Sequence, residues 1–167
     1  YGDFCNQLMN NSRDYGFYTE LFPAIMQGEW VEESILSALD AIYHRLEEFD
    51  VVVIIRGGGA TSDLSGFDTY LLAASCAQFP LPIITGIGHE RDDTGIDKVA
   101  HTRVKTPTAA AEFLIAKMDK CADVLDETSS RLTQGVRNRL LWEHRRMESL
   151  KQRIPSAVYK RIADAKY

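Results

Sequence analysis

Two short stretches of this chain carry residue types that could bind phosphate and move protons. The first is Arg56 followed by Gly57, Gly58 and Gly59. A guanidinium group is a planar fork of donors that matches phosphate oxygens, and a glycine run lets backbone N–H groups approach an anion closely. The same residues are also compatible with a tight turn beside a solvated arginine. The stretch is not a P-loop, because no Gly-Lys-Ser/Thr follows it.

The second stretch, residues 86–93, places a histidine among carboxylates. His89 is suited to proton transfer or nucleophilic attack near neutral pH, and Asp92 could orient its imidazole. A solvated loop histidine beside solvated acids is an equally simple interpretation. The acidic group could instead hold a divalent metal, as in a metal-dependent nuclease; that group consists of Glu90, Asp92, Asp93 and Asp97.

Both stretches follow apolar runs that predict buried strands. Residues 51–55 are five consecutive β-branched residues, typical of a strand covered on both faces of a parallel sheet. A second short apolar strand is expected over residues 82–87. In a right-handed parallel α/β arrangement the two glycine-bearing strand ends lie on one edge of the sheet, where ligands bind in such folds. We therefore expect Arg56 and His89 to share a rim.

The other elements of the expected α/β domain are a strand and three helices. Strand-forming residues predict a strand over residues 16–24, ending near Pro23. Apolar spacing of three or four predicts helices over residues 3–9, 31–46 and 67–76. Asp3 lies in the first turn of the opening helix, where the helix dipole favours a carboxylate.

The last third of the chain predicts a long helix. Thr106 is a suitable N-cap and Pro107 suits the first helical position. Apolar residues then follow heptad spacing, offset by one residue as in a stutter, which predicts a coiled coil; the stripe is Leu114, Met118, Cys121, Leu125, Thr128, Leu132, Val136, Leu140, Met147, Leu150 and Ile154. We expect an α/β domain over residues 1–105 and a helical, coiled-coil region over residues 106–167.

Composition sets limits on the class of protein. The 167 residues carry a net charge of −5, but residues 1–116 hold 7 basic and 17 acidic side chains (−10), whereas residues 117–167 hold 12 and 7 (+5). A basic arm could meet nucleic acid or an acidic partner, although mixed charges on a solvated helix are the simpler explanation. Three distant cysteines predict buried thiols rather than disulfides or a zinc site. No leader or long apolar run is present, so we expect a cytoplasmic protein without a membrane span.

Taken together, several motifs resemble the large subunit of exodeoxyribonuclease VII. They are Arg56-Gly57-Gly58-Gly59 with Asp63-Leu64 and Phe67, Gly88-His89-Glu90 with Asp92, then Asp97, Val99-Ala100, Arg103 and Thr106-Pro107-Thr108-Ala109-Ala110-Ala111-Glu112. Each piece alone is weak, but their order and spacing are specific. The resemblance extends from Tyr1 to about Leu114, and the remainder agrees in being helical.

The resemblance implies a Rossmann-like parallel sheet, an OB-fold and a first strand that would precede Tyr1, and exonuclease activity on single-stranded DNA. It implies no required divalent metal or other cofactor, and a hetero-oligomer in which several copies of a small subunit bind the coiled coil. By motif match the catalytic residues are Asp3, Arg56, His89 and Asp92, with Gly57–Gly59 and Arg103 on phosphate or DNA. A non-catalytic phosphate-binding module and a metal-dependent nuclease are the alternatives.

Overall fold

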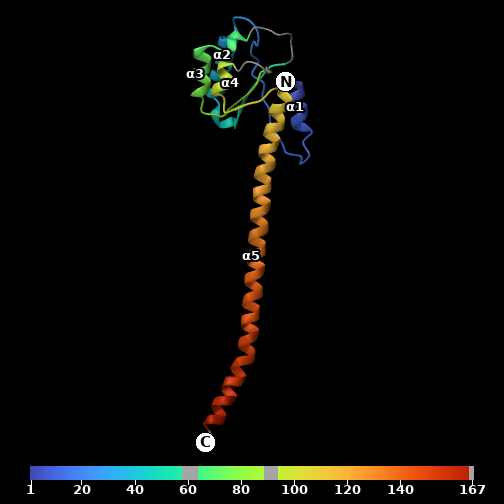
Figure 1. Ribbon diagram of the computed structural model, residues 1–167, viewed down its shortest axis with the longest axis vertical. Coiled ribbons are helices and arrows are strands. Elements are labelled where there is room, and N and C mark those ends of the chain that lie inside the picture. The colour runs from blue at the N-terminus through green and yellow to red at the C-terminus, as the bar shows by residue number, and fades with distance from the viewer. Residues whose placement is uncertain (58–63, 89–93, 166–167) are drawn as a thin grey trace. The chain divides into compact units, whose positions relative to one another are not determined.

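The computed structural model describes residues 1–57, 64–88 and 94–165. It shows an α/β arrangement with a small parallel sheet and a long C-terminal helix (Figure 1). The helices are α1 (Gly2–Met9), α2 (Val31–Tyr43), α3 (Tyr70–Ala77), α4 (Gly95–Val99) and α5 (Pro107–Asp164), with short 3-10 turns η1 (Leu46–Glu48) and η2 (Ser65–Phe67). The strands are β1 (Val52–Ile55), β2 (Ile83–Gly86) and β3 (Thr102–Arg103).

The three strands run parallel in the order β1-β2-β3. Ile55 of β1 is in register with Gly86 of β2, and Thr85 is in register with Arg103 of β3. The predicted parallel pairing of the two glycine-ended strands is therefore confirmed. The two-residue strand β3 was not predicted.

Strand β1 is packed on both faces, as its apolar run predicts. Val52 and Ile54 belong to one buried cluster, which also contains the apolar stripe of α2. Val53 and Ile55 pack against a second cluster, formed by α1, β2 and the first turns of α5. Because alternate residues of a strand point to opposite faces, this division places helices on both sides of the sheet.

The strand predicted over residues 16–24 is wrong, since the structure describes this whole segment and assigns it no strand. Two of its three aromatic residues, Phe17 and Phe22, are used for packing rather than for sheet pairing, whereas Tyr18 is exposed. Phe17 packs against the cluster of α1 and α5, whereas Phe22 packs against the cluster of α2 and meets Phe49 edge to face at 5.6 Å. Strand propensity measures how well a residue fits a half-buried surface, and this segment finds such a surface without joining the sheet.

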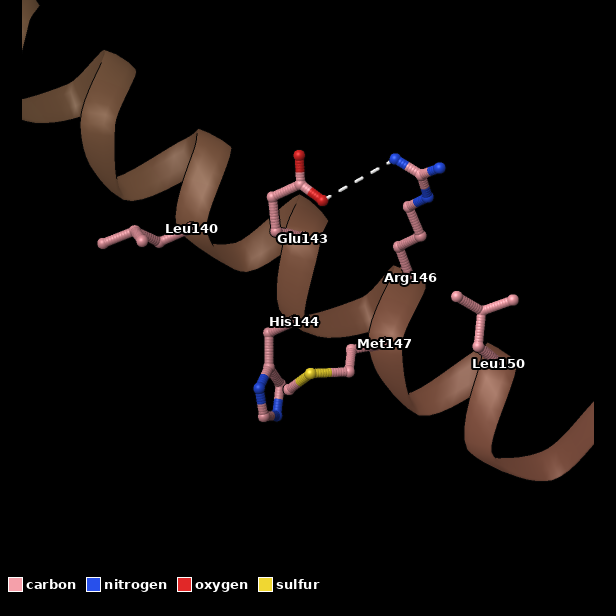
Figure 2. A pocket seen from close by; sticks show the side chains of 6 residues that line it. All are labelled: Leu140, Glu143, His144, Arg146, Met147 and Leu150. Atoms are coloured by element: carbon pink, nitrogen blue, oxygen red, sulfur yellow. Dashed lines mark ion pairs between the residues drawn. The ribbon is translucent and has the colours of Figure 1, made fainter.

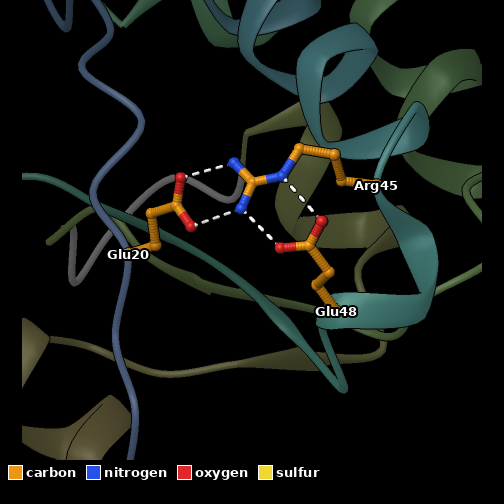
Figure 3. Close-up of polar contacts among 3 residues, drawn as sticks. All are labelled: Glu20, Arg45 and Glu48. Carbon is orange, nitrogen blue, oxygen red and sulfur yellow. Dashed lines mark hydrogen bonds and ion pairs between the residues drawn. The ribbon is translucent and has the colours of Figure 1, made fainter.

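Arg45 links residues 16–24 to η1 through hydrogen bonds to Glu20 and Glu48 (Figure 3). Its guanidinium donates to both carboxylate oxygens of Glu20 at 2.6 and 2.8 Å and to both oxygens of Glu48 at 3.0 and 2.6 Å. These hydrogen bonds lower the pKa of both glutamates and raise that of Arg45. The guanidinium also lies over the ring of Phe49, 5.2 Å from its centroid.

Helix α5 begins as predicted at Thr106-Pro107. The Thr106 hydroxyl accepts a hydrogen bond from the Ala109 backbone N–H at 3.1 Å, which caps the helix start. The chain divides into two compact units, Tyr1–Met118 and Asp119–Tyr167, and the second consists of the later turns of α5. Within residues 1–57, 64–88 and 94–165, no helix combines the length and the apolar character that crossing a membrane requires.

The cysteines were expected to be buried, which holds for one of them. Cys76 is buried in α3, Cys5 is half-buried, and Cys121 is exposed on α5. Burial raises the pKa of the Cys76 thiol to about 11.

Candidate active site

The candidate site lies at the carboxyl edge of the sheet, where β1 and β2 end side by side. Arg56 directly follows β1, and its backbone N–H donates to the Gly86 carbonyl at 3.2 Å. The residue is only 6% exposed, so this arginine belongs to the edge of the core rather than to the solvated surface. A buried guanidinium is costly unless hydrogen bonds and charges accompany it, and such positions are common at functional sites.

The glycines at this edge differ in their surroundings. A Cβ added to Gly57 would meet no described atom within 4 Å, whereas one added to Gly86 would lie 3.2 Å from the Thr106 carbonyl oxygen and from Ile55 Cγ2. Gly88 has a φ of +90°, a backbone conformation that glycine adopts without a steric penalty. The backbone after β2 thus adopts a left-handed conformation at Gly88, the residue that precedes His89 in the sequence.

Four of the predicted site residues lie outside the described residues: Gly58, Gly59, His89 and Asp92. So do Glu90 and Asp93 of the acidic group considered as metal ligands. The expected meeting of Arg56 and His89 therefore stays a prediction.

Asp3 and Arg103 are the remaining predicted site residues. Asp3 is exposed in the first turn of α1, the helix whose Phe4 and Leu8 pack with Ile84 of β2. Arg103 lies on β3, and its Nε is 3.9 Å from Asp97 Oδ2. Arg56 directly follows β1, Gly86 ends β2 and Arg103 lies on β3, so Arg56 and Arg103 flank the central strand β2.

Asp97 is a central acceptor at this edge. Its side chain is 6% exposed, and one oxygen accepts from the Thr85 hydroxyl at 2.6 Å. The other accepts from the Thr94 hydroxyl at 2.8 Å and the Thr94 backbone N–H at 3.2 Å. The Thr94-x-x-Asp97 spacing is that of a capping box and could have predicted the second set of bonds, but nothing local predicts the bond to Thr85.

A second concave surface lies on α5 alone (Figure 2). It is lined by Leu140, Glu143, His144, Arg146, Met147 and Leu150. Glu143 is 3.9 Å from Arg146 and 2.7 Å from Arg139, so its charge is balanced within the same helix. The surface is part of the apolar stripe, which Glu143 and His144 interrupt.

The fold and this edge define an α/β protein with a parallel sheet and an arginine on either side of its central strand, the edge at which ligands bind in open α/β sheets. Comparison with known proteins is more specific. The family model described as "Exonuclease VII, large subunit" matches residues 1–166. The chain belongs to this family.

Its relatives include proteins named "Exodeoxyribonuclease 7 large subunit" from several bacteria. The one from Lactobacillus helveticus is 34% identical over 144 residues, which is 84% of this chain and 32% of the relative. Those from Shewanella baltica and Moorella thermoacetica are 37% and 38% identical over 85% and 78% of this chain, in each case 32% of the relative. The chain thus spans about a third of the length of these relatives.

Proposed function

We propose that this chain contributes the catalytic centre of an exodeoxyribonuclease VII-type enzyme, which hydrolyses phosphodiester bonds of single-stranded DNA and releases oligonucleotides. Family membership supports the class of reaction. The observation that carries the site is the placement of Arg56 beside Gly86, at the parallel ends of β1 and β2. A ligand phosphate at that edge would meet a guanidinium and backbone N–H groups together.

In the proposed mechanism, protein groups rather than a metal ion stabilise the attacked phosphate. Arg56 and the N–H groups of Gly57–Gly59 would neutralise the negative charge that develops on the phosphate oxygens. His89 would activate water, attack the phosphorus or protonate the leaving oxygen, with Asp92 orienting its imidazole. Asp3 would be the second proton-transfer group or a support for one.

Replacing Arg56 with lysine tests the role of the guanidinium. Lysine keeps the charge but loses the planar fork, so kcat should fall by roughly 100- to 1000-fold, the range expected when an oriented donor to a transition state is lost. Arg45→Lys is the matched control, because Arg45 is held by Glu20 and Glu48 at an exposed position. Equal turnover by the two variants would remove Arg56 from the mechanism.

The need for a metal is tested by release of acid-soluble nucleotides from single-stranded DNA in excess EDTA. The full-length protein, assembled with its small subunit, is compared with a His89→Ala variant. Activity that survives EDTA and disappears in the variant supports metal-independent hydrolysis that depends on His89. Activity lost to EDTA would point to the carboxylates as metal ligands, and no activity in either protein would favour a phosphate-binding module.

We further propose that α5 forms a coiled coil and binds copies of the small subunit. Its stripe residues Leu125, Leu132 and Leu140 are 69%, 68% and 65% exposed, which is unusual for leucines at regular helical spacing. Replacing Leu125 and Leu132 with glutamate should abolish copurification of the small subunit. Unchanged copurification would exclude this stripe as the binding surface.

The charge distribution predicts weak DNA binding by this chain alone. Residues 1–116 carry −10, and a phosphate backbone binds to basic surfaces. Single-stranded DNA should therefore bind the isolated chain weakly in a fluorescence anisotropy titration. Tight, salt-sensitive binding would contradict this.

A further inference from the structure

The buried carboxylate of Asp97 joins three segments that reach the candidate site. Through Oδ1 it accepts from Thr85 of β2, and through Oδ2 it accepts from Thr94 at the start of α4 and lies 3.9 Å from Nε of Arg103 on β3. Thr85 is 0% exposed and Thr94 is 2% exposed, so water cannot replace these bonds. Hydrogen bonds from buried donors to an ionised acceptor are the stronger kind.

These contacts fix the residues that border the site. Thr85 precedes Gly86, whose carbonyl accepts from the Arg56 backbone, and the Thr85 carbonyl accepts from the Val104 N–H at 2.8 Å. Thr85 lies within β2 and Thr94 directly precedes α4, so one carboxylate binds residues on both elements. A change in Asp97 would therefore alter the end of β2 and the guanidinium of Arg103 together.

We propose that Asp97 is a positioning residue for the reaction: it acts through Thr85 and Arg103 to hold the carboxyl edge of the sheet in its productive arrangement. This inference rests on the proposed function. Small errors in the placement of reacting groups lower turnover more than they lower substrate binding. The loss of Asp97 should therefore reduce kcat and leave KM nearly unchanged.

The competing explanation is that Asp97 only caps α4. Asp68 offers a matched control, because its carboxylate accepts from the Gly95 backbone N–H at 2.5 Å, also at the start of α4. In the described part of the chain, Asp68 makes no hydrogen bond or ion pair with β2 or β3, whereas Asp97 contacts both strands. Removing either carboxylate weakens the cap, but only one removal affects the sheet edge.

The test compares Asp97→Asn with Asp68→Asn in the full-length protein assembled with its small subunit. With a single-stranded oligonucleotide as substrate, we expect Asp97→Asn to lower kcat roughly 10- to 100-fold with KM changed less than about threefold. Asp68→Asn should stay within about threefold of the unmodified enzyme. Equal kcat values for the two variants would overturn the proposal.

Hydrogen exchange gives a readout that does not depend on activity. Asp97→Asn should speed amide exchange in β2, α4 and β3 together, whereas Asp68→Asn should speed it only in α4. If the unmodified protein shows no nuclease activity, the proposed function fails, and the exchange pattern alone decides whether Asp97 joins these segments. Exchange changes confined to α4 in both variants would overturn the inference.

Thr85 provides a second route if Asp97→Asn does not fold. Thr85→Val removes the hydroxyl that donates to Asp97 while keeping a β-branched side chain, and Thr85→Ser keeps the hydroxyl. We expect Thr85→Val to lower kcat and Thr85→Ser to retain most of it. Equal activity in the two variants would contradict the proposal.

Discussion

Replacing Gly66 with alanine tests the packing between η2 and α2. A Cβ at this position would lie 2.7 Å from Val31 Cβ and 3.2 Å from each of its γ carbons. Val31 is the first residue of α2 and is 1% exposed. Rotation about χ1 moves the γ carbons but not the Cβ, so the backbones of the two segments must separate.

The expected cost follows from this contact. Carbon atoms pack best at about 3.5–4.0 Å, so roughly 1 Å of overlap must be relieved. Overpacking of this kind destabilises the folded state by about 1–3 kcal/mol. Replacing glycine with alanine also reduces the entropy of the unfolded chain, which stabilises the folded state by about 0.4–1 kcal/mol. We expect a net loss of about 1–2 kcal/mol in the free energy of unfolding.

Urea unfolding of this chain, followed by tryptophan fluorescence, measures the effect. Trp30 lies beside Val31. The sequence has two tryptophans, and a Trp142→Phe background leaves Trp30 as the single fluorescent probe. With a urea m-value of about 1–3 kcal/mol/M, the midpoint should fall by roughly 0.5–1 M. Gly57→Ala is the matched control, since its Cβ would meet no described atom within 4 Å. If the two variants share a midpoint, the packing argument is refuted.

Three further outcomes are expected. Arg45→Met should lower the urea midpoint at pH 7 but not near pH 3. The hydrogen bonds from Arg45 lower the pKa of Glu20 and Glu48 in the folded chain, so their stabilising effect is present at a pH above the ordinary glutamate pKa of 4.5 and is lost as the pH falls through the lowered pKa values. Cys121 should react with iodoacetamide in the folded chain, and Cys76 only after unfolding, as peptide mass spectrometry would show, because Cys76 is buried and the pKa of its thiol is about 11. Thr106→Ala should lower the free energy of unfolding by about 1 kcal/mol, because it removes the cap at the start of α5. It should also speed amide exchange at Ala109, whose N–H donates to the Thr106 hydroxyl.

Much of the sheet was predictable, because its strands satisfy a local rule. The β-branched run of residues 51–55 predicts a strand buried on both faces, and Val52 and Val53 do pack on opposite sides. Residues 16–24 show the limit of this rule. They have strand composition, but Phe22 finds its partner in Phe49 and the segment stays outside the sheet.

The candidate site was predictable only where its residues are adjacent in sequence. Arg56 and its glycines form a recognisable pattern, and parallel pairing brings them to the end of β2. The short strand β3 has no such pattern, because pairing with β2 rather than propensity makes it a strand. The bond from Thr85 to Asp97 likewise crosses 12 positions and joins a strand to a helix, which no local spacing encodes.

The glycines at the two strand ends look alike in sequence, but the structure places them in different surroundings: Gly86 is crowded by neighbouring atoms, and Gly57 is not crowded by any atom that the structure describes. The carbonyl of Thr106 accepts the N–H of Ala110 in the first turn of α5, and a Cβ on Gly86 would press against that same oxygen. Packing of α5 on β2 is therefore sufficient to explain Gly86 without a ligand. Gly57 has no such neighbour among the described residues. Loss of activity without loss of stability in Gly57→Ala would thus point to close approach of a ligand. Gly86→Ala should lose stability together with activity, which packing alone explains.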